Sequence, residues 1–456
     1  MKSSVGMDYT LYESDGIGFD YEAMMAGIGY SLDDIAAIQA AGGVGNTPLI
    51  ELKNITELAR RSAARGRGAR IFIKDEAANP SGSFKARRAA VSVYQAKKLG
   101  FKGVMAATSG NYGAAVASQA AMAGLKCIIV QECYDSEGRG QPEILEKARK
   151  CEAYGAEVLQ LSVGPELFYV YLLLLEETGY FNASLYTAFG IAGVETLGME
   201  LILQCRKMVG KDPDTVVVTN AGGGNLTGTA RGILKAGGQG VEIIGASVDL
   251  AGLHMASDRD FNKKSFTTGH TGFGVPFCTN PDRSDVPRSA ARPLRYMDRY
   301  VTVKQGEVFY TTEALARLEG LERGPAGNTS LAAALALARE MKQDEILVVQ
   351  ETEYTGAGKH ILPQLSFARA NGIKIEIGDP GHEVPGMNIV LPSDPGKMGV
   401  RELDLMKIKT SYLRRFIKEG NRAPLTEADM DYLSAELRLS RERVGEILEK
   451  LGETEK

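Results

Sequence analysis

The sequence alternates short runs of β-branched and apolar residues with longer Ala-rich stretches, and this alternation limits the possible fold more than any other feature. Apolar runs at 69–76, 102–108 and 125–132 are followed by stretches of helical character at 84–100, 111–124 and 142–155. Further apolar runs lie at 156–162, 215–220, 242–249 and 344–351. Such alternation is typical of parallel βαβ units, so we expect an α/β fold with doubly wound parallel sheets. Ligands bind such sheets at the carboxyl ends of strands.

Charge and cysteine usage exclude several functional classes. With 53 Lys and Arg against 57 Asp and Glu, the formal charge is −4, which does not indicate a nucleic-acid or membrane-surface binder. The five Cys form no CxxC pair and no Cys/His cluster at metal spacing, so we expect neither a disulfide framework nor a metal site. The acidic N-terminus lacks the apolar run of a signal peptide, which favours a cytoplasmic protein. The 53 Gly suggest a Gly-lined ligand site.

Shifts in composition suggest four segments. Residues 1–44 are predicted to form an N-terminal arm with a helix at 31–41 capped by Ser31. Residues 45–95 and 190–400 are predicted to form a large domain, residues 96–189 a small domain, and residues 401–456 a charged helical tail. Within the large domain, 251–300 is irregular and is expected to act as a lid or binding loop. In the tail, Leu433, Leu437 and Leu439 mark an apolar face that belongs either to a partner interface or to a solvated helix.

The most informative segment contains Lys85 in the sequence Asn-Pro-Ser-Gly-Ser-Phe-Lys-Ala-Arg-Arg. It follows a predicted strand and leads into a predicted helix, so Lys85 stands at a strand-to-helix junction. Burial and the nearby Arg87 and Arg88 favour a neutral amine, the form that makes a Schiff base. The other interpretation is an ordinary surface lysine on a first helical turn.

A second segment, Thr108-Ser109-Gly110-Asn111-Tyr112-Gly113, lies between a predicted strand and an Ala-rich helix. Backbone amides and hydroxyls at such a helix N-terminus suit a carboxylate, and the Asn111 amide can donate to an anionic oxygen. The plain alternative is an N-cap turn without a ligand.

A third segment, 219–228, places Gly222, Gly223, Gly224, Asn225 and Leu226 directly between a strand and a helix. Consecutive Gly amides at a helix N-terminus form a phosphate cradle. The loop is not a Walker A motif, and its spacing only approximates a dinucleotide fingerprint with Asp249 as a possible ribose ligand. A nicotinamide-binding domain is therefore an alternative for this motif, although it leaves Lys85 and 108–113 unexplained.

Taken in this order, the three segments resemble those of the fold-type II pyridoxal-phosphate enzymes, the superfamily of threonine synthase and cysteine synthase. The resemblance implies two parallel-sheet domains with the cofactor between them. It also implies that Lys85 binds the cofactor covalently, that Gly222 to Leu226 hold its phosphate, and that Asn111 contacts its ring oxygen. Thr108, Ser109, Gly110, Asn111 and Tyr112 would then bind the substrate.

Two segments are alternative candidates for the contact to the pyridine nitrogen of the cofactor. The turn 353–359 resembles a threonine synthase segment whose Thr contacts this nitrogen, a role that falls on Thr355. The segment 325–330 resembles the one from which cysteine synthases supply a Ser, which leaves Asn328 and Ser330 as alternatives. A neutral hydroxyl partner would leave the pyridine nitrogen unprotonated and moderate the capacity of the ring to accept electrons. We favour Thr355.

Over residues 15–395 the chain resembles more narrowly the β subunits of the 2-amino-4-oxopentanoate thiolases. The resemblance rests on longer runs at 44–56, 74–90, 106–121, 219–232, 264–277 and 321–333. It implies a pyridoxal-phosphate-dependent acyltransferase of ornithine degradation that uses coenzyme A to form acetyl-CoA and D-alanine. It also implies a small α subunit as partner and a dimer of the β chain. Other lyases or replacement enzymes of the superfamily, such as threonine synthase or diaminopropionate ammonia-lyase, are the alternative.

Several residues are candidates for the second half of such a reaction. The attacking thiolate belongs either to coenzyme A or to an enzyme cysteine, for which Cys133 and Cys278 are the candidates, whereas Cys127, Cys151 and Cys205 fall in core runs. His254, His270 and His360 are candidate proton carriers, although an ordinary hydrogen-bonding role is favoured for each. His270 is the first to test, because its flanking Gly residues suggest close ligand approach. Five arginines suggest a contact to the phosphates of coenzyme A, a solvated face or a subunit contact: Arg283, Arg288, Arg292, Arg295 and Arg299.

Overall fold

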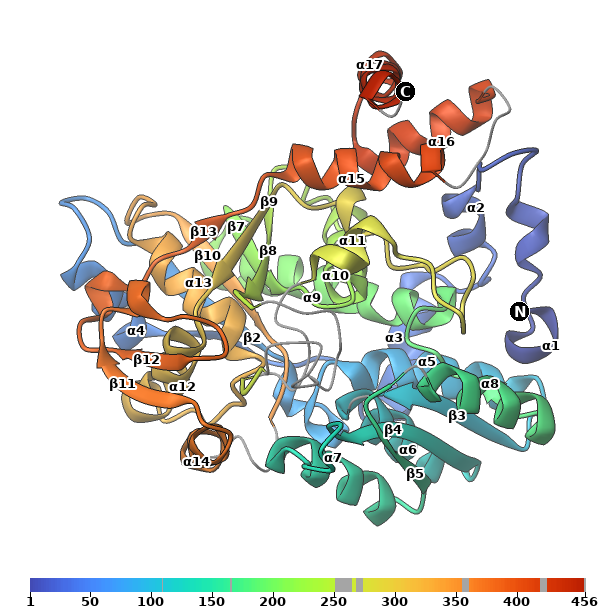
Figure 1. Cartoon of the computed structure of the whole chain (residues 1–456), viewed down its shortest axis with the longest axis horizontal. Helices are drawn as coiled ribbons and strands as arrows, with labels where there is room; N and C mark the ends of the chain where they lie inside the picture. Colours follow the sequence, from blue (N-terminus) through green and yellow to red (C-terminus); the bar gives the residue numbers. More distant parts are fainter. Residues whose placement is uncertain are drawn as a thin grey trace.

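A computed structural model describes residues 1–108, 110–164, 166–250, 265–267, 274–354, 361–418 and 425–454, and it contains two main sheets (Figure 1). In the larger sheet the strand order is β1-β2-β10-β7-β8-β9-β13. The five central strands are parallel, and β1 and β13 close the two edges in antiparallel orientation. The bounds are β1 (Leu49–Glu51), β2 (Arg70–Asp75), β7 (Thr215–Thr219), β8 (Glu242–Val248), β9 (Arg299–Val303), β10 (Ile346–Glu351) and β13 (Arg401–Glu402).

The smaller sheet has the order β5-β4-β3-β6, and all of its strands are parallel. Its strands are β3 (Gly103–Thr108), β4 (Lys126–Tyr134), β5 (Glu157–Ser162) and β6 (Phe181–Asn182). A separate parallel pair consists of β11 (Lys374–Gly378) and β12 (Asn388–Pro392). The predicted α/β fold with two parallel sheets is thus confirmed. The strands of the smaller sheet all lie between residues 96 and 189, and the domain boundaries themselves stay a prediction.

Helices cover both faces of the sheets (Figure 1). In the first half of the chain they are α1 (Lys2–Val5), α2 (Tyr21–Ala26), α3 (Leu32–Ala41), α4 (Lys53–Arg61), α5 (Lys85–Lys98), α6 (Asn111–Ala123), α7 (Pro142–Ala153), α8 (Glu166–Thr178) and α9 (Ala188–Val209). In the second half they are α10 (Gly224–Lys235), α11 (Val275–Thr279), α12 (Gln305–Glu319), α13 (Asn328–Ala338), α14 (Leu362–Ala370), α15 (Leu405–Lys418), α16 (Glu427–Leu437) and α17 (Arg441–Thr454).

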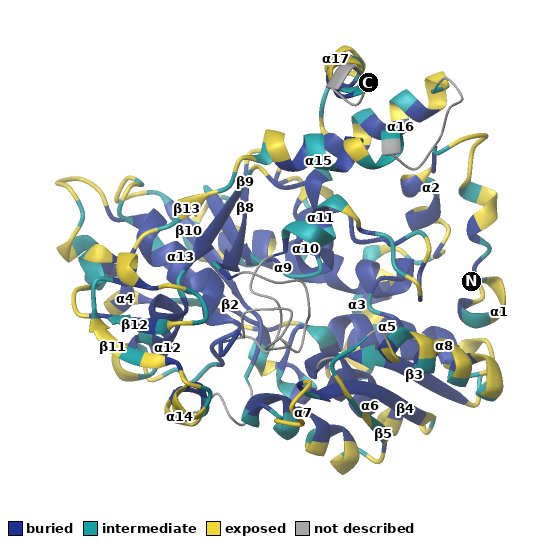
Figure 2. Ribbon diagram, viewed as in Figure 1, coloured by how far each residue is buried: buried dark blue, intermediate teal, exposed yellow. Residues whose placement is uncertain are grey.

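One apolar core runs through both sheets by way of α5, α6 and α9. It joins Val216 of the larger sheet to Ile129 of the smaller one, and both side chains are fully buried. The strands β4 and β8 are drawn mostly in the colour of buried residues in Figure 2. Helix α9 is apolar and long enough to cross a membrane by length and composition, but it packs on α5 and α10 and most of it is buried within the protein. The continuous core holds the two sheets at a fixed separation, which places their strand ends around a common site.

The N-terminal arm and the C-terminal helices pack on the body of the protein and on each other. Helix α3 begins after Ser31, whose hydroxyl forms a capping box with Asp34, as the sequence predicts. In the C-terminal helices Leu433 and Leu437 are fully buried in the main core. The backbone amides of residues 17 and 18 both donate to Asp429 at 2.9 Å. The predicted apolar face of the tail is therefore covered by this chain itself, and α16 is not a solvated helix.

Candidate functional site

A cavity of about 330 Å³ lies where the carboxyl ends of strands from both sheets meet. Strand-end residues from each sheet line it: Thr108 and Glu132 from the smaller sheet, and Thr219, Asn220, Ser247, Val248, Thr352 and Glu353 from the larger one. Side chains gathered from so many strand ends are the usual composition of a ligand site in parallel α/β proteins. The cavity also brings together Lys85 and the loop of Gly222, Gly223, Gly224 and Asn225, which the sequence places far apart.

Lys85 is the first residue of α5 and lies in the cavity wall. The turn before it is tightly wound, because Ser81 (φ 64°) and Gly82 (φ 74°) both adopt left-handed conformations. Removal from water lowers the pKa of the Lys85 amine to about 8; the Glu353 carboxylate raises this value, and the cations of Lys147 and Arg88 lower it further. Near physiological pH the neutral amine is therefore a minority form, but it is far more populated than at the ordinary lysine value of 10.5, as a nucleophilic lysine requires.

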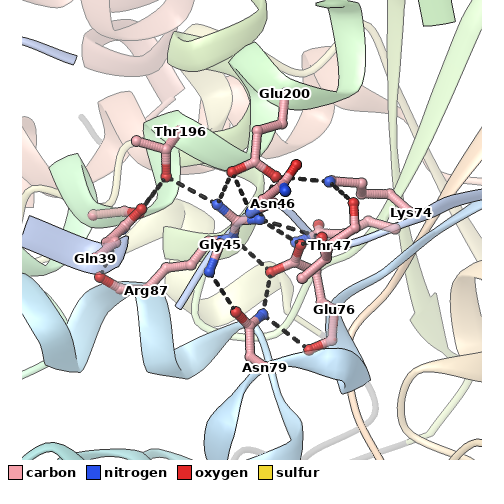
Figure 3. A network of polar contacts seen from close by, with 12 residues as sticks. Gln39, Gly45, Asn46, Thr47, Lys74, Glu76, Asn79, Arg87, Thr196 and Glu200 are labelled. Carbon is pink, nitrogen blue, oxygen red and sulfur yellow. Dashed lines mark hydrogen bonds and ion pairs between the residues drawn. The ribbon is translucent and has the colours of Figure 1, made fainter. Parts of the chain in front are cut away.

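A buried polar network holds the helix that carries Lys85 (Figure 3). The guanidinium of Arg87, two residues along α5, donates to both carboxylate oxygens of Glu76 and of Glu200 at 2.7–2.9 Å. Lys74 also donates to Glu200, and burial alone would raise the pKa of Glu200, but these cations lower it to about 2. Breaking such a buried network is costly, so the start of α5 is fixed relative to β2 and α9. Arg87 therefore holds Lys85 in place from outside the cavity.

The Gly loop forms the N-terminus of α10. Gly223 (φ 82°) is the N-cap, and the first intrahelical bond runs from the Thr227 amide to the Gly223 carbonyl at 3.0 Å. The preceding amides of Gly224, Asn225 and Leu226 therefore have no partner within the helix. A side chain on Gly222 would collide with the Tyr186 hydroxyl, and one on Gly223 would lie 2.7 Å from Pro293. The loop thus keeps its amides accessible, which is the arrangement that binds phosphate.

The segment 108–113 forms the N-terminus of α6. The Thr108 hydroxyl accepts from the amides of Gly110 (2.9 Å) and Gly113 (3.2 Å), and Gly110 takes φ 152°. Thr108 and Tyr112 line the cavity, and the Tyr112 hydroxyl donates to the Ala183 carbonyl. Asn111 begins the helix, and its buried amide nitrogen has no partner among the described residues. Ser109 lies outside the described residues.

The two proposed partners of the pyridine nitrogen are placed differently. Thr355 lies outside the described residues. Asn328 and Ser330 are fully buried, and their amide nitrogen and hydroxyl donate to groups of the surrounding protein. Thr329, between them, lines the cavity, and its buried hydroxyl is without a partner among the described residues. Sequence reasoning missed Thr329, since a run of polar residues at a helix start does not tell which one faces a ligand.

Two carboxyl residues of the cavity were also missed, Glu132 and Glu353. Burial raises the pKa of Glu132 to about 8, and Glu353 acts on the pKa of Lys85. Glu132 ends the apolar run 125–132, and Glu353 lies two residues after the end of β10 at Glu351. Their positions at or near strand ends could have identified them from the sequence, because residues at the carboxyl ends of strands form the site.

The predicted cysteine candidates do not line the cavity. Cys133 packs in a small cluster with Ile144 and Ala148, and Cys278 accepts a hydrogen bond of 3.8 Å from Asn220. Burial raises the pKa of both thiols to about 12, which suppresses the reactive thiolate. Cys127, Cys151 and Cys205 are buried as expected for core residues. His254, His270 and His360 lie outside the described residues.

Among the five arginines only Arg283 lines the cavity. Its guanidinium lies 4.0 Å from the ring of Phe277 and 4.6 Å from that of Tyr186, and its buried Nε and one Nη have no partner among the described residues. The other four contact carboxylates: Arg288 meets Glu13, Arg292 and Arg295 meet Glu436, and Arg299 meets Glu402. Asp249, the possible ribose ligand, pairs with Lys304 at 2.7 Å and does not line the cavity.

These residues suit an aldehyde that carries a phosphate. The cavity supplies a lysine with a lowered pKa and a helix N-terminus whose first amides have no partner within the helix. It also supplies three buried polar atoms without a partner among the described residues, namely the Thr219 and Thr329 hydroxyls and the Asn220 amide oxygen. Buried polar groups are rarely left unpaired unless a ligand completes them. The residues present therefore fit pyridoxal phosphate.

Comparison with known proteins supports the same assignment. Residues 40–351 match the family described as "Pyridoxal-phosphate dependent enzyme". The chain is 68% identical over 451 residues to the "2-amino-4-ketopentanoate thiolase beta subunit" of Acetoanaerobium sticklandii, covering 99% of this chain and 96% of the relative. A second protein of that name, from an unknown prokaryotic organism, is 64% identical over 452 residues, again covering 99% and 96%. A threonine synthase of a Bacillus species is 28% identical over 300 residues, covering 63% of this chain and 76% of that protein.

Solved structures agree with the fold. A threonine deaminase from T.th. superimposes with a TM-score of 0.53 at 28% identity and covers 71% of this chain and 98% of that chain. A mutant of O-ureido-L-serine synthase, solved with O-ureido-L-serine bound, has a TM-score of 0.54 at 21% identity, with coverage of 74% and 93%. The predicted fold class, cofactor and family are confirmed by these comparisons together. The chain belongs to the pyridoxal-phosphate-dependent enzymes and, among them, to the family of the 2-amino-4-ketopentanoate thiolase beta subunits.

Proposed function

We propose that this chain is the catalytic β subunit of a thiolase that uses coenzyme A to cleave 2-amino-4-ketopentanoate into acetyl-CoA and D-alanine. The observation that carries the proposal is a single cavity that holds both Lys85 and the amide cradle of α10, in a chain 68% identical to a thiolase beta subunit. The role of each site residue is part of the proposal.

Bound to Lys85, pyridoxal phosphate supplies an electron sink for negative charge on the substrate. The chain's own groups position and protonate the substrate. The amine of Lys85 removes the proton from Cα and later returns a proton to carbon, which its pKa of about 8 allows in both directions near neutral pH. The Glu353 carboxylate raises this pKa and the Lys147 cation lowers it, so neighbouring charges adjust the base strength of Lys85.

The substrate carboxylate binds at the N-terminus of α6, where Thr108, Ser109, Gly110, Asn111 and Tyr112 supply amides, hydroxyls and the Asn111 amide group. The amide nitrogen of Asn111, which has no partner in the described part of the chain, supports this assignment, as does the position of Thr108 and Tyr112 in the cavity wall. Phe84, Leu167 and Phe168 make part of the remaining wall apolar and exclude water from the reacting carbon. The ring nitrogen of the cofactor meets either Thr355 or Thr329.

The bond broken is the one between Cβ and C4. The thiolate sulfur of coenzyme A attacks the C4 carbonyl, Cβ departs with the bonding electron pair, and the acetyl group stays on sulfur as acetyl-CoA. Protonation of the former Cβ then leaves alanine. We assign the attack to coenzyme A itself, because Cys133 and Cys278 are buried outside the cavity wall and their thiol pKa values are about 12.

The relatives' designation as beta subunits supports a small α subunit as partner, and we propose a dimer of the β chain at the centre of the complex. We place the enzyme in the cytoplasm, in agreement with five cysteines that are all free thiols.

The proposal is tested by reconstitution. The chain is purified with pyridoxal phosphate, combined with the α subunit, and supplied with 2-amino-4-ketopentanoate and coenzyme A. We expect acetyl-CoA and D-alanine in equal amounts, and no product from Lys85→Ala, in which borohydride no longer fixes the cofactor to the peptide that carries residue 85. Release of ammonia without acetyl-CoA would instead indicate a lyase of the threonine synthase type.

A further inference from the structure

Arg88 is a buried cation without an anionic partner in the described part of the chain. It lies on α5 one turn after Lys85, is 2% exposed, and lines the same cavity. Its Nη1 donates to the Leu185 carbonyl at 3.1 Å, its guanidinium lies 5.1 Å from the Phe84 ring, and its buried Nε has no partner among the described residues. The neighbouring Arg87 is equally buried but is paired with two glutamates. On the same helix, the fold therefore provides carboxylate partners for the guanidinium of Arg87 and none, among the described residues, for that of Arg88.

An unpaired buried charge is costly, so an open guanidinium facing a cavity indicates an anionic ligand. Burial lowers the pKa of Arg88 to about 10, which still leaves the group charged at physiological pH. A neutral ligand or water would leave most of this cost uncompensated. The cavity therefore takes an anion close to Arg88.

The anion's position follows from Gly224, the first residue of α10. A side-chain carbon built on Gly224 would lie 3.0 Å from both terminal nitrogens of Arg88 and 2.8 Å from Ile191. The guanidinium thus lies against the start of α10, beside the amides of Gly224, Asn225 and Leu226, which have no partner within the helix. Two independent sources of positive potential, a helix N-terminus and a full cation, meet at one point of the cavity.

We propose that Arg88 binds the phosphate of pyridoxal phosphate directly, so that this group is held by the α10 amides and by one guanidinium. A phosphate monoester carries about −1.5 to −2 charges, and a helix N-terminus supplies only about +0.5. The positive charge of Arg88 would neutralise much of the negative charge that remains on the phosphate. The proposal rests on the cofactor family and not on the thiolase reaction, so it can fail while the proposed function stands.

The test compares apoenzyme binding of pyridoxal phosphate and of pyridoxal, which lacks the phosphate, in wild type, Arg88→Lys and Arg88→Met. We expect Arg88→Met to weaken pyridoxal phosphate binding about 10- to 100-fold and to change pyridoxal binding less than about threefold, because only the charged contact is lost. Arg88→Lys should fall between them. The ³¹P resonance of bound cofactor should shift in both variants.

The thermal stability of the apoenzyme separates this role from a purely structural one. Removal of an uncompensated buried charge should leave the melting temperature of Arg88→Met apoenzyme unchanged or higher, while the rise on adding pyridoxal phosphate becomes smaller. Arg206→Met on α9, which loses an exposed pair with Asp212, is the matched control and should bind both compounds as wild type does.

Three results would overturn the proposal. Equal weakening of pyridoxal phosphate and pyridoxal would assign Arg88 to the ring or to the fold. A less stable apoenzyme of Arg88→Met with unchanged cofactor affinity would make it structural. Unchanged cofactor affinity together with a raised KM for coenzyme A in the reconstituted enzyme would assign it to the phosphates of coenzyme A instead.

Discussion

The backbone amide of Phe84 donates a hydrogen bond of 3.0 Å to the carbonyl of Thr352, which ties the residue before Lys85 to the end of β10. The Tyr354 amide returns a bond of 2.8 Å to Gly82, and residues 83 and 353 form an isolated antiparallel bridge. Glu353, held by this bridge, is one of the groups that set the pKa of Lys85. The positions of the nucleophile and of its charged neighbour are therefore fixed by the same backbone contacts.

The first prediction concerns the pH dependence of cofactor capture by the apoenzyme. The folded pKa of Lys85 is about 8, so the neutral amine and the capture rate should fall about tenfold for each pH unit below 8 and level off above it. Glu353→Gln removes a carboxylate that favours the protonated amine, so the midpoint should move to lower pH. Stopped-flow absorbance gives the rate. A midpoint near the ordinary lysine value of 10.5 would contradict the prediction.

The second prediction concerns the phosphate cradle. Gly223→Ala must hold an alanine at φ 82° and place its side chain 2.7 Å from Pro293, which costs about 1–2 kcal/mol for the backbone alone. We expect affinity for pyridoxal phosphate to fall at least about tenfold as the amides shift. Gly240→Ala is the control, because no atom of the described residues lies within 4 Å of its added carbon. Titration of both apoenzymes measures the difference, and similar affinities would count against the loop.

The third prediction tests a contact to coenzyme A. Arg283 lines the cavity, and two of its nitrogens have no partner among the residues that the structure describes. Arg283→Met should therefore raise the KM for coenzyme A about tenfold and leave the cofactor spectrum unchanged. Arg299→Met, at the sheet edge beside Glu402, should behave as wild type. Initial rates at varied concentrations of coenzyme A and of the amino acid give the KM for each substrate. A raised KM for the amino acid alone would move Arg283 to the other substrate.

The fourth prediction concerns an enzyme-bound acetyl group. Cys133→Ser and Cys278→Ser should each keep turnover within about twofold of wild type, because neither thiol lines the cavity and each has a pKa of about 12. Acetyl-CoA formation and mass spectrometry of the quenched protein measure the outcome. Loss of turnover in a well-folded Cys133→Ser variant, with an acetyl adduct on the wild-type residue, would restore the cysteine as acyl carrier.

The fifth prediction concerns the anchoring of the C-terminal helices. Burial alone would raise the pKa of Glu436, but Arg292 and Arg295 lower it below its ordinary 4.5. Glu436→Gln leaves two buried cations undercompensated and should reduce the free energy of unfolding by about 3–5 kcal/mol at neutral pH. Because the folded pKa is lowered, this stabilisation is present above pH 4.5 and is lost as the pH falls through the folded value.

Chemical denaturation at several pH values measures this difference. Glu446→Gln, which loses an exposed pair with Arg443, should cost less than about 1 kcal/mol. Equal effects of the two substitutions would show that the buried contact does not anchor the helix.

The sequence by itself determined the fold class and the family, because strand–helix alternation is a local property and the Lys85 and Gly-loop motifs are contiguous in the chain. Ser31 capping α3 and the three segments at strand ends follow from the same local rules. For the predicted tail, only the tertiary structure decided that Leu433 and Leu437 are covered by this chain. The tertiary structure also decided which of three adjacent polar residues lines the cavity. Thr329 lines it, and Asn328 and Ser330 do not.

The partners of the charged residues were also decided only by the tertiary structure. Arg87 and Arg88 are adjacent in sequence, yet one is paired with Glu76 and Glu200 and the other faces the start of α10. Glu200 is more than a hundred residues away along the chain, and the amides beside Gly224 are farther still. Burial and electrostatic pairing depend on which distant segments the fold brings together, and no local pattern in the sequence contains that information.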